Sequence, residues 1–205
     1  MKIAQILALA ALTGSIPIGH IVLRLKTGAS PTQALLTAGY LKRKVGPLGT
    51  AVVALLILAK GYVAVTFARA SFDSPWVAAA AGVLVIVSDC FPYWLMFRRS
   101  GSGLVAALGT LAGLSLPAAL SAAVVWGAVL AASRRGSIAS ITAAITAPVW
   151  LKVFGGNNTY IWYALAGCAF VIILHSSNIS RLLDGTEPPL WGDGSVKGRS
   201  GGKEV

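Results

Sequence analysis

Apolar side chains fill most of this chain and are interrupted only by short polar stretches. The apolar runs cover about residues 3–23, 47–68, 76–97, 103–114, 116–132, 137–154 and 159–174. A helix needs about 20 apolar residues to cross the hydrocarbon core of a bilayer, and most of these runs approach that length. The pattern therefore predicts an all-α integral membrane protein, a helical bundle of seven segments.

The composition agrees with this prediction. The 205 residues are 56% hydrophobic and only 11% charged, with a mean hydropathy of +0.77. A soluble domain carries about 25% charged residues. We expect one transmembrane domain over residues 1–185, followed by a polar, flexible cytoplasmic tail over residues 186–205. The tail contains Pro188-Pro189 and several glycines and serines.

Residues 103–132 are too long for one simple span. A single helix there would be about 45 Å long, more than a membrane needs. The sequence Leu114-Ser115-Leu116-Pro117 offers a break, because proline fits the first turn of a new helix. Run 103–114 is then predicted to be a short half-span.

The basic residues set the predicted orientation. With seven segments and an outside N-terminus, the loops 24–46, 98–102 and 133–136 and the C-terminal residues 175–205 are all cytoplasmic. These segments hold 13 of the 17 lysines and arginines, as the positive-inside rule requires. A cleaved signal peptide is the alternative for the start of the chain. The first apolar run continues to Leu23, however, which favours a retained first span.

The net charge of +11 could indicate a nucleic-acid partner. Most of the basic residues lie in short loops, so we interpret them as topology signals and contacts with anionic membrane lipids, and expect no nucleic acid. Cys90 and Cys168 lie within apolar runs and are typical of small buried side chains rather than of a disulfide. No metal-ligand spacing or dinucleotide fingerprint is present, so no metal or cofactor is expected.

Polar residues gather where the half-span begins, in Arg98-Arg99-Ser100-Gly101-Ser102-Gly103. A Gly/Ser loop before a helix presents unpaired N–H groups and the positive end of the helix dipole. Paired arginines add bidentate phosphate recognition. The stretch is either an anion site or an ordinary positive loop. The candidate ligand residues are Arg98, Arg99, Gly101, Ser102 and Gly103.

Two further polar stretches are predicted at the same membrane face. The same pattern of two arginines followed by small residues recurs before the sixth run, in Arg134-Arg135-Gly136-Ser137. We expect Ser137 to cap the helix that begins there. The last apolar run ends at His175, followed by Asn178 and Arg181. On a continuous helix these three side chains share one face, because each is three residues from the next. Such a donor-rich face suits a phosphate or a carboxylate.

Two charged residues lie inside apolar runs, Lys60 in the second and Asp89 in the third. Charges within the membrane are costly, so each is expected to face the bundle interior or water. The sequence leaves open whether they pair with each other. The stretch from Gly14 to Gly19 surrounds Pro17 and predicts a kink, which serves either helix packing or a groove.

Several of these stretches together resemble the bacterial acyl-phosphate:glycerol-3-phosphate acyltransferases (PlsY). The resemblance covers most of residues 7–187 and rests on matching order and spacing. It is strongest at Gly14-Ser15-Ile16-Pro17-Ile18-Gly19, Lys60-Gly61, Phe91-Pro92, Ser137–Thr142, His175, Asn178-Ile179, Arg181-Leu182-Leu183 and Gly185-Thr186-Glu187. It implies a small seven-helix enzyme of the bacterial inner membrane that acylates glycerol 3-phosphate from acyl phosphate. Ser137, His175 and Asn178 match positions around the glycerol-phosphate phosphate.

Other motifs of that family are changed here. The serine of its first internal loop corresponds at best to Thr32, and its Gly-His pair is replaced by Ser88-Asp89. The aspartate three residues before Lys60 has become Ile57. The second lysine of the acyl-phosphate loop has become Ser102. Thr32 and Asp89 are therefore the candidate catalytic residues, with Asp89 a possible base if burial strengthens it.

Two functions follow from this comparison. The first is acyl transfer to glycerol 3-phosphate in phospholipid synthesis, retained or weakened. The second is a non-catalytic lipid-binding protein or an accessory subunit of a larger membrane complex with partner chains. A small transporter or channel is a distant third hypothesis, because the sequence shows no inverted repeat with broken helices.

Overall fold

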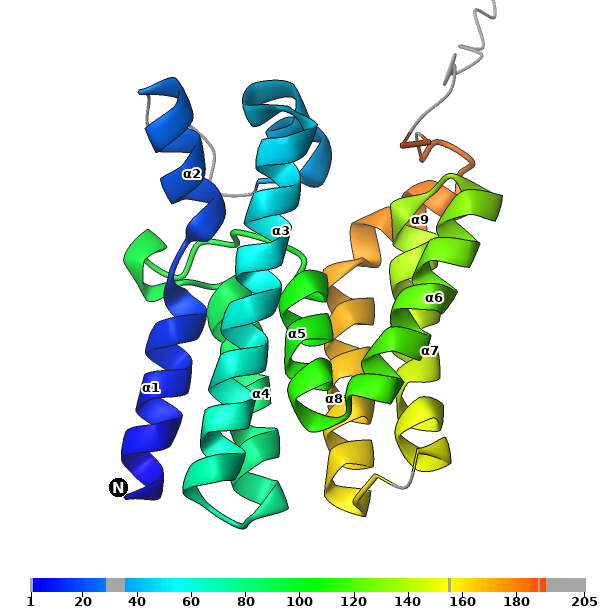
Figure 1. Cartoon of the computed structure of the whole chain (residues 1–205). Helices are drawn as coiled ribbons and strands as arrows, with labels where there is room; N and C mark the ends of the chain where they lie inside the picture. Colours follow the sequence, from blue (N-terminus) through cyan, green and yellow to red (C-terminus); the bar gives the residue numbers. More distant parts are fainter. Residues whose placement is uncertain (1, 29–35, 155, 188, 191–205) are drawn as a thin grey trace, which may run out of the picture.

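The computed structural model describes residues 2–28, 36–154, 156–187, 189 and 190, and this part of the chain contains helices and no β-strand. The helices follow one another as up-and-down segments of one bundle (Figure 1). They are α1 (Ile3–Ser15), α2 (Ile18–Thr27), α3 (Ala38–Ser71), α4 (Pro75–Cys90), the short 3₁₀ helix η1 (Tyr93–Leu95), α5 (Leu104–Leu114), α6 (Leu116–Ser133), α7 (Gly136–Val153), α8 (Asn158–Leu174) and α9 (Ser176–Leu183).

The prediction of an all-α membrane protein is confirmed. Among the described residues, five helical stretches are long and apolar enough to cross a membrane: Ile3–Thr27, Ala38–Ser71, Pro75–Leu95, Leu116–Ser133 and Gly136–Val153. The pair formed by α8 and α9 makes a sixth if it counts as one span, although it bends by 60°. Helix α5 is the shorter apolar helix where the half-span was predicted.

The first span is broken in its middle. Helix α1 ends at Ser15 and α2 begins at Ile18, because Pro17 has no N–H to continue the ladder. The Ile18 N–H turns to the Ile16 carbonyl (2.9 Å) instead of the Gly14 carbonyl. Just before the break α1 touches α4 closely. A Cβ on Gly14 would lie 2.8 Å from Val85 Cα, so only glycine fits there.

The second span is longer than the sequence predicts. The predicted loop 24–46 contains the end of α2 and the first turns of α3, so the prediction of a simple loop there was wrong in these described parts. A kink at Gly46, with φ +80°, separates these turns from the apolar part of α3. Pro47 then starts the apolar part, where its missing N–H costs little.

The break between α5 and α6 is confirmed at Ser115. Its hydroxyl accepts a hydrogen bond from the Ala118 N–H, and Pro117 lies in the first turn of α6. The corner therefore stops short of the far end of the bundle (Figure 1). The Arg69 side chain of α3 lies at the C-terminus of α5, where Nη1 donates to the carbonyls of Gly113 (2.8 Å) and Leu114 (3.2 Å). A cation at the end of a helix stabilises the helix dipole.

The described parts of the four predicted cytoplasmic segments lie toward one end of the bundle. Figure 1 shows α2, the start of α3, the α6–α7 corner and α9 in the upper part, while the N-terminus and the α3–α4 turn lie at the opposite end. This arrangement brings the predicted polar stretches to one side. The assignment of that side to the cytoplasm stays a prediction.

Candidate functional site

Lys60 and Asp89, whose pairing the sequence left open, form a buried ion pair. Lys60 Nζ on α3 lies 2.6 Å from Asp89 Oδ1 on α4, and the two side chains are 6% and 12% exposed. The same ammonium donates to the carbonyls of Gly14 (2.8 Å) and Ile16 (3.1 Å). Those carbonyls are available because the first span breaks there. Lys60 thus joins α3 to α4 and to the break.

A cavity of about 150 Å³ lies beside this ion pair; much of its lining is apolar, and we call it the polar cavity because Asp89, His20 and the Gly/Ser loop also line it. Asp89 lines it together with Gly19 and His20 of α2 and with the apolar wall of α3. The loop before α5 closes it with four consecutive residues, Ser100, Gly101, Ser102 and Gly103. His20 and Asp89 are the titratable side chains among the described residues that line this cavity.

Backbone hydrogen bonds hold this loop against its neighbours. The Ser100 N–H donates to the Cys90 carbonyl (2.8 Å), and the Leu36 N–H donates to the Ser100 carbonyl (3.1 Å). Gly103 has φ +68° and precedes α5, and a Cβ there would lie 2.6 Å from Cys90 Sγ. The loop therefore requires glycine at this position, and α5 begins without a side-chain cap.

Of the two arginines before the loop, Arg99 is built into the structure. Its Nη2 donates to the Leu174 carbonyl at the end of α8 (2.5 Å), and its Nε donates to the Gly101 carbonyl (3.5 Å). His175, the next residue, is buried and donates from Nδ1 to the Val171 carbonyl (2.9 Å). Arg98 is exposed. Arg99 thus joins the polar cavity to the last helices.

A second polar cluster lies where α7 begins and α9 ends. The Ser137 hydroxyl lies 2.7 and 2.6 Å from the two carboxylate oxygens of Glu187, and Asn178 Nδ2 donates to Oε1 of the same carboxylate (3.0 Å). Ser137 and Glu187 are both buried. The chain reaches this position by turning back at Gly185, with φ +68°, so that the Glu187 N–H meets the Arg181 carbonyl (3.1 Å).

Ser137 was predicted to cap its helix, and that prediction was wrong. Helix α7 begins at Gly136 with Arg135 as its unbonded cap, and the Ser137 hydroxyl turns to Glu187 instead. Sequence reasoning gave Glu187 no role. The available signal was an acidic residue two positions after Gly185, a glycine that can reverse the chain. The Leu190 N–H also donates to the Arg134 carbonyl (2.8 Å), so the described start of the predicted tail packs on the domain.

The other predicted site residues are distributed differently from the sequence pattern. His175, Asn178 and Arg181 do not lie on one continuous helix, because the chain bends by 60° where α8 meets α9. His175 belongs to the end of α8, whereas Asn178 joins the Glu187 cluster. The Arg181 side chain is exposed and only its carbonyl is used. Thr32 lies outside the described residues.

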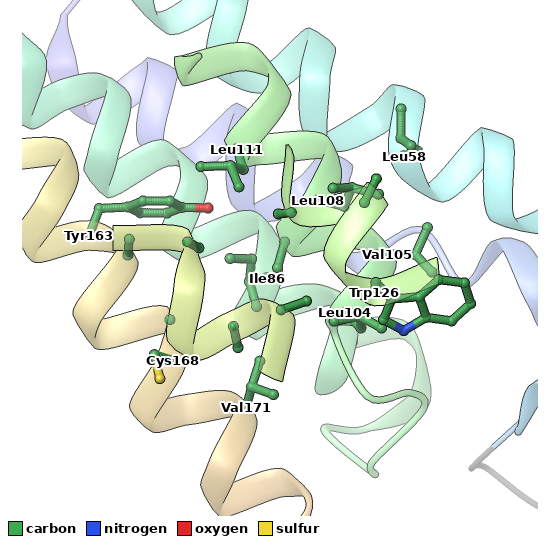
Figure 2. Close-up of a pocket in the computed structure, with 18 of the residues that line it drawn as sticks. Leu58, Ile86, Leu104, Val105, Leu108, Leu111, Trp126, Tyr163, Cys168 and Val171 are labelled. Atoms are coloured by element: carbon green, nitrogen blue, oxygen red, sulfur yellow. The ribbon is translucent and has the colours of Figure 1, made fainter. Parts of the chain in front are cut away.

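An apolar pocket of about 290 Å³ adjoins the polar cavity. It lies among the helices α3 to α8, and Figure 2 shows Tyr163 and Leu111 on one side of it and Val105 and Trp126 on the other. The Tyr163 hydroxyl is hydrogen bonded to Thr110, so its polar end is satisfied within the bundle. Ala54 and Val105 line both the pocket and the cavity.

This pair of spaces suits an amphiphilic ligand. The apolar pocket can take an alkyl chain, and the Gly/Ser loop beside it can donate hydrogen bonds to a polar head. The described residues that line the cavity include no lysine or arginine, and Lys60 reaches it only through Asp89.

Comparisons with known proteins agree with this geometry. The family model described as "Glycerol-3-phosphate acyltransferase" matches residues 4–185. A protein named glycerol-3-phosphate acyltransferase from Synechococcus sp. (strain CC9902) is 34% identical over 186 residues, covering 89% of this chain and 92% of its own. One of the same name from Gloeobacter violaceus is 35% identical over 190 residues, covering 87% of this chain and 90% of its own.

Two solved structures share the fold. Both are crystal structures of PlsY, an integral membrane glycerol 3-phosphate acyltransferase, and both are 30% identical to this chain. The lysophosphatidic acid form has a TM-score of 0.85 and covers 92% of this chain and 95% of its own. The glycerol 3-phosphate form has a TM-score of 0.84 and covers 94% of this chain and 96% of its own.

Proposed function

The chain belongs to the glycerol-3-phosphate acyltransferase family, and from that premise we propose that it transfers an acyl group from acyl phosphate to glycerol 3-phosphate in phospholipid synthesis. A hydroxyl oxygen of glycerol 3-phosphate attacks the acyl carbonyl carbon and forms the ester bond. The bond from that carbon to the phosphate oxygen breaks, and its electron pair leaves with phosphate. The hydroxyl proton passes to a base, and the products are lysophosphatidic acid and phosphate.

The contact between the apolar pocket and the polar cavity carries this proposal. Ala54 and Val105 line both spaces. In this proposal the acyl chain lies in the pocket, and its activated carbonyl lies past these two residues, in the cavity. An acyl phosphate is already activated, so correct positioning of the two reactants supplies much of the rate. Because the two spaces are adjacent, one acyl phosphate molecule can place its alkyl chain in the pocket and its carbonyl in the cavity.

The loop from Ser100 to Gly103 supplies donors for the acyl phosphate in this proposal. It leads into α5, whose first N–H groups have no partner within the helix. Such groups stabilise a phosphate or the negative oxygen that forms during acyl transfer. Ser102 contributes a hydroxyl, and Arg99 brings a positive charge to the base of the loop.

The phosphate of glycerol 3-phosphate is proposed to bind on the other side of Arg99. Ser137, Asn178 and His175 are the polar side chains on that side, and Asn178 keeps a second amide N–H beyond the one it gives to Glu187. The exposed Arg98 and Arg181 add positive charge. Glu187 supports this assignment, because it holds the Ser137 hydroxyl and the Asn178 amide in fixed positions. A PlsY structure at 30% identity is a glycerol 3-phosphate form.

We further propose that the site opens to the cytoplasm of a bacterium, with the protein in the inner membrane and its N-terminus outside. Figure 1 places α2 and the start of α3 at the same end of the bundle, and these elements carry Arg24, Lys26 and the run from Lys42 to Lys44. Positive residues are retained on the cytoplasmic side of bacterial membrane proteins. Glycerol 3-phosphate would then reach the site from the cytoplasm.

The test is to purify the protein in detergent, add acyl phosphate and glycerol 3-phosphate, and measure lysophosphatidic acid and released phosphate. We expect both products in equal amounts. An acyl thioester supplied in place of acyl phosphate shows whether the donor class is correct. If no product forms at high protein concentration, the alternative of a lipid-binding protein or an accessory subunit replaces the enzyme. Partner chains that remain bound through purification would then identify the complex.

A further inference from the structure

The buried ion pair between Lys60 and Asp89 has a role that sequence reasoning did not give it. We propose that Asp89 is a positioning residue, the counter-ion that lets Lys60 hold both polar walls of the cavity, and not the base of the reaction. The proposal deepens the proposed acyl transfer and rests on it. The ion pair itself is observed independently of any reaction.

Lys60 uses all of its hydrogen-bond donors within the protein. An ammonium group has three N–H donors, and Lys60 uses them on Asp89 Oδ1 and on the carbonyls of Gly14 and Ile16. The side chain is 6% exposed, so water does not take the place of a lost partner. Removal of the carboxylate charge would leave a buried, uncompensated cation, which is strongly unfavourable.

The three partners of Lys60 lie at the two opposite walls of the polar cavity or next to them. Gly14 and Ile16 border the break from which α2 starts, and α2 places Gly19 and His20 on one wall of the cavity. Asp89 lies at the end of α4 next to Cys90, whose carbonyl holds Ser100 of the opposite wall. Lys60 thus fixes both walls to α3 through one charged group. A change in its charge balance would move the loop and α2 together.

The ion pair also bears on whether Asp89 can act as a base. Lys60 does not line the cavity, whereas Asp89 does, and a Cβ on Gly101 would lie 3.9 Å from Asp89 Oδ2. A base must take up a proton during each reaction cycle. Protonation of Asp89 would break its ion pair with Lys60 at that moment, and the buried ammonium would lose its only described counter-ion. The geometry therefore favours an Asp89 that keeps its ion pair with Lys60 throughout the reaction.

Position 57 provides the means to test this. Ile57 lies three residues before Lys60 on α3, which places the two side chains on the same helix face, and it lines the same cavity as Asp89. A carboxylate at position 57 can therefore supply the missing charge from another direction. It cannot place an oxygen atom where Asp89 has it, at the end of α4.

The experiment compares four purified variants: Asp89→Asn, Ile57→Asp, the double variant Ile57→Asp with Asp89→Asn, and the matched control Ile57→Asn with Asp89→Asn. Thermal unfolding in detergent and the rate of lysophosphatidic acid formation are measured for each. We expect Asp89→Asn to lower the unfolding temperature by about 10 °C. We expect its rate to fall about tenfold or more. The Asp-containing double variant should regain most of both, and the Asn-containing control should regain neither.

Two results would overturn the proposal. If the Asp-containing double variant regains stability but stays inactive, then Asp89 acts directly on the substrate and is not a positioning residue. If that variant is no more stable than its Asn-containing control, then Lys60 does not need a counter-ion. The stability measurement needs no substrate. It therefore decides the counter-ion role even if the unaltered protein forms no lysophosphatidic acid, in which case the proposed function alone has failed.

Discussion

The Ser137 hydroxyl at the start of α7 lies within 2.7 Å of both carboxylate oxygens of Glu187, fifty positions later in the chain. Asn178 donates to the same carboxylate, so one buried acid fixes two donors on two different helices. These two side chains are among those proposed to bind the phosphate of glycerol 3-phosphate. Under that proposal Glu187 positions them for the acceptor substrate.

We expect Glu187→Gln to raise the KM for glycerol 3-phosphate by about tenfold and to change kcat less, because a lost hydrogen bond to a charged group is worth roughly that factor. The glutamine amide places a donor opposite the donors of Ser137 and Asn178. Initial rates at varied glycerol 3-phosphate measure the effect. Asp184→Asn is the control, since Asp184 is an exposed acid three residues earlier. An unchanged KM in Glu187→Gln would contradict the assignment.

The apolar pocket predicts an effect on acyl-chain length. Gly167 on α8 lines the pocket, and a Cβ there meets no atom within 4 Å, so Gly167→Phe should fill the pocket without a backbone clash. We expect the rate with long-chain acyl phosphate to fall by at least about tenfold and the preference to move to shorter chains. The measurement is a comparison of kcat/KM over a series of chain lengths.

Gly127→Phe is the matched control for that series. Gly127 on α6 also has no atom within 4 Å of an added Cβ, but it does not line the pocket. Its chain-length profile should equal that of the unaltered protein. If both phenylalanine variants change the profile equally, or neither does, the pocket is not where the acyl chain binds.

His20 is expected to take the proton of the glycerol hydroxyl if Asp89 is a permanent counter-ion. It is the other titratable side chain among the described residues that line the cavity. We expect His20→Gln, which keeps hydrogen-bonding capacity but cannot accept a proton, to lower kcat by about a hundredfold with little change in KM. Unfolding temperatures of the variant and the unaltered protein control for a loss of structure. A kcat within twofold of normal would leave the base elsewhere.

The packing of α3 on α5 predicts a contrast in stability. A Cβ on Gly109 would lie 2.2 Å from the Leu58 carbonyl oxygen, so Gly109→Ala must push the two helices apart. We expect it to destabilise the protein by about 1–3 kcal/mol. Gly127→Ala, in open space, should instead stabilise it by about 0.5–1 kcal/mol, because alanine favours the helix. Thermal or denaturant unfolding in detergent measures both, and equal shifts would contradict the close approach.

The sequence by itself determined the class of the fold and most of its segments. Hydrophobic runs as long as a bilayer needs predict membrane helices, because backbone groups in lipid must bond within their own segment. The break before Pro117 and the kink at Pro17 were predictable for the same local reason, since proline has no N–H. The order and spacing of the motifs also indicated the family, because both are properties of the linear chain.

The tertiary structure decided which polar groups meet. The pairing of Lys60 with Asp89 depends on how α3 packs against α4, and neither helix encodes that alone. The helical face proposed for His175, Asn178 and Arg181 failed because the chain bends at His175, where no proline or glycine signals it. The hydrogen-bond partner of Ser137 is Glu187, a residue fifty positions away in the chain. Long-range contacts of this kind follow from packing, which is cooperative over the whole bundle, whereas helix formation and membrane insertion are read from local composition.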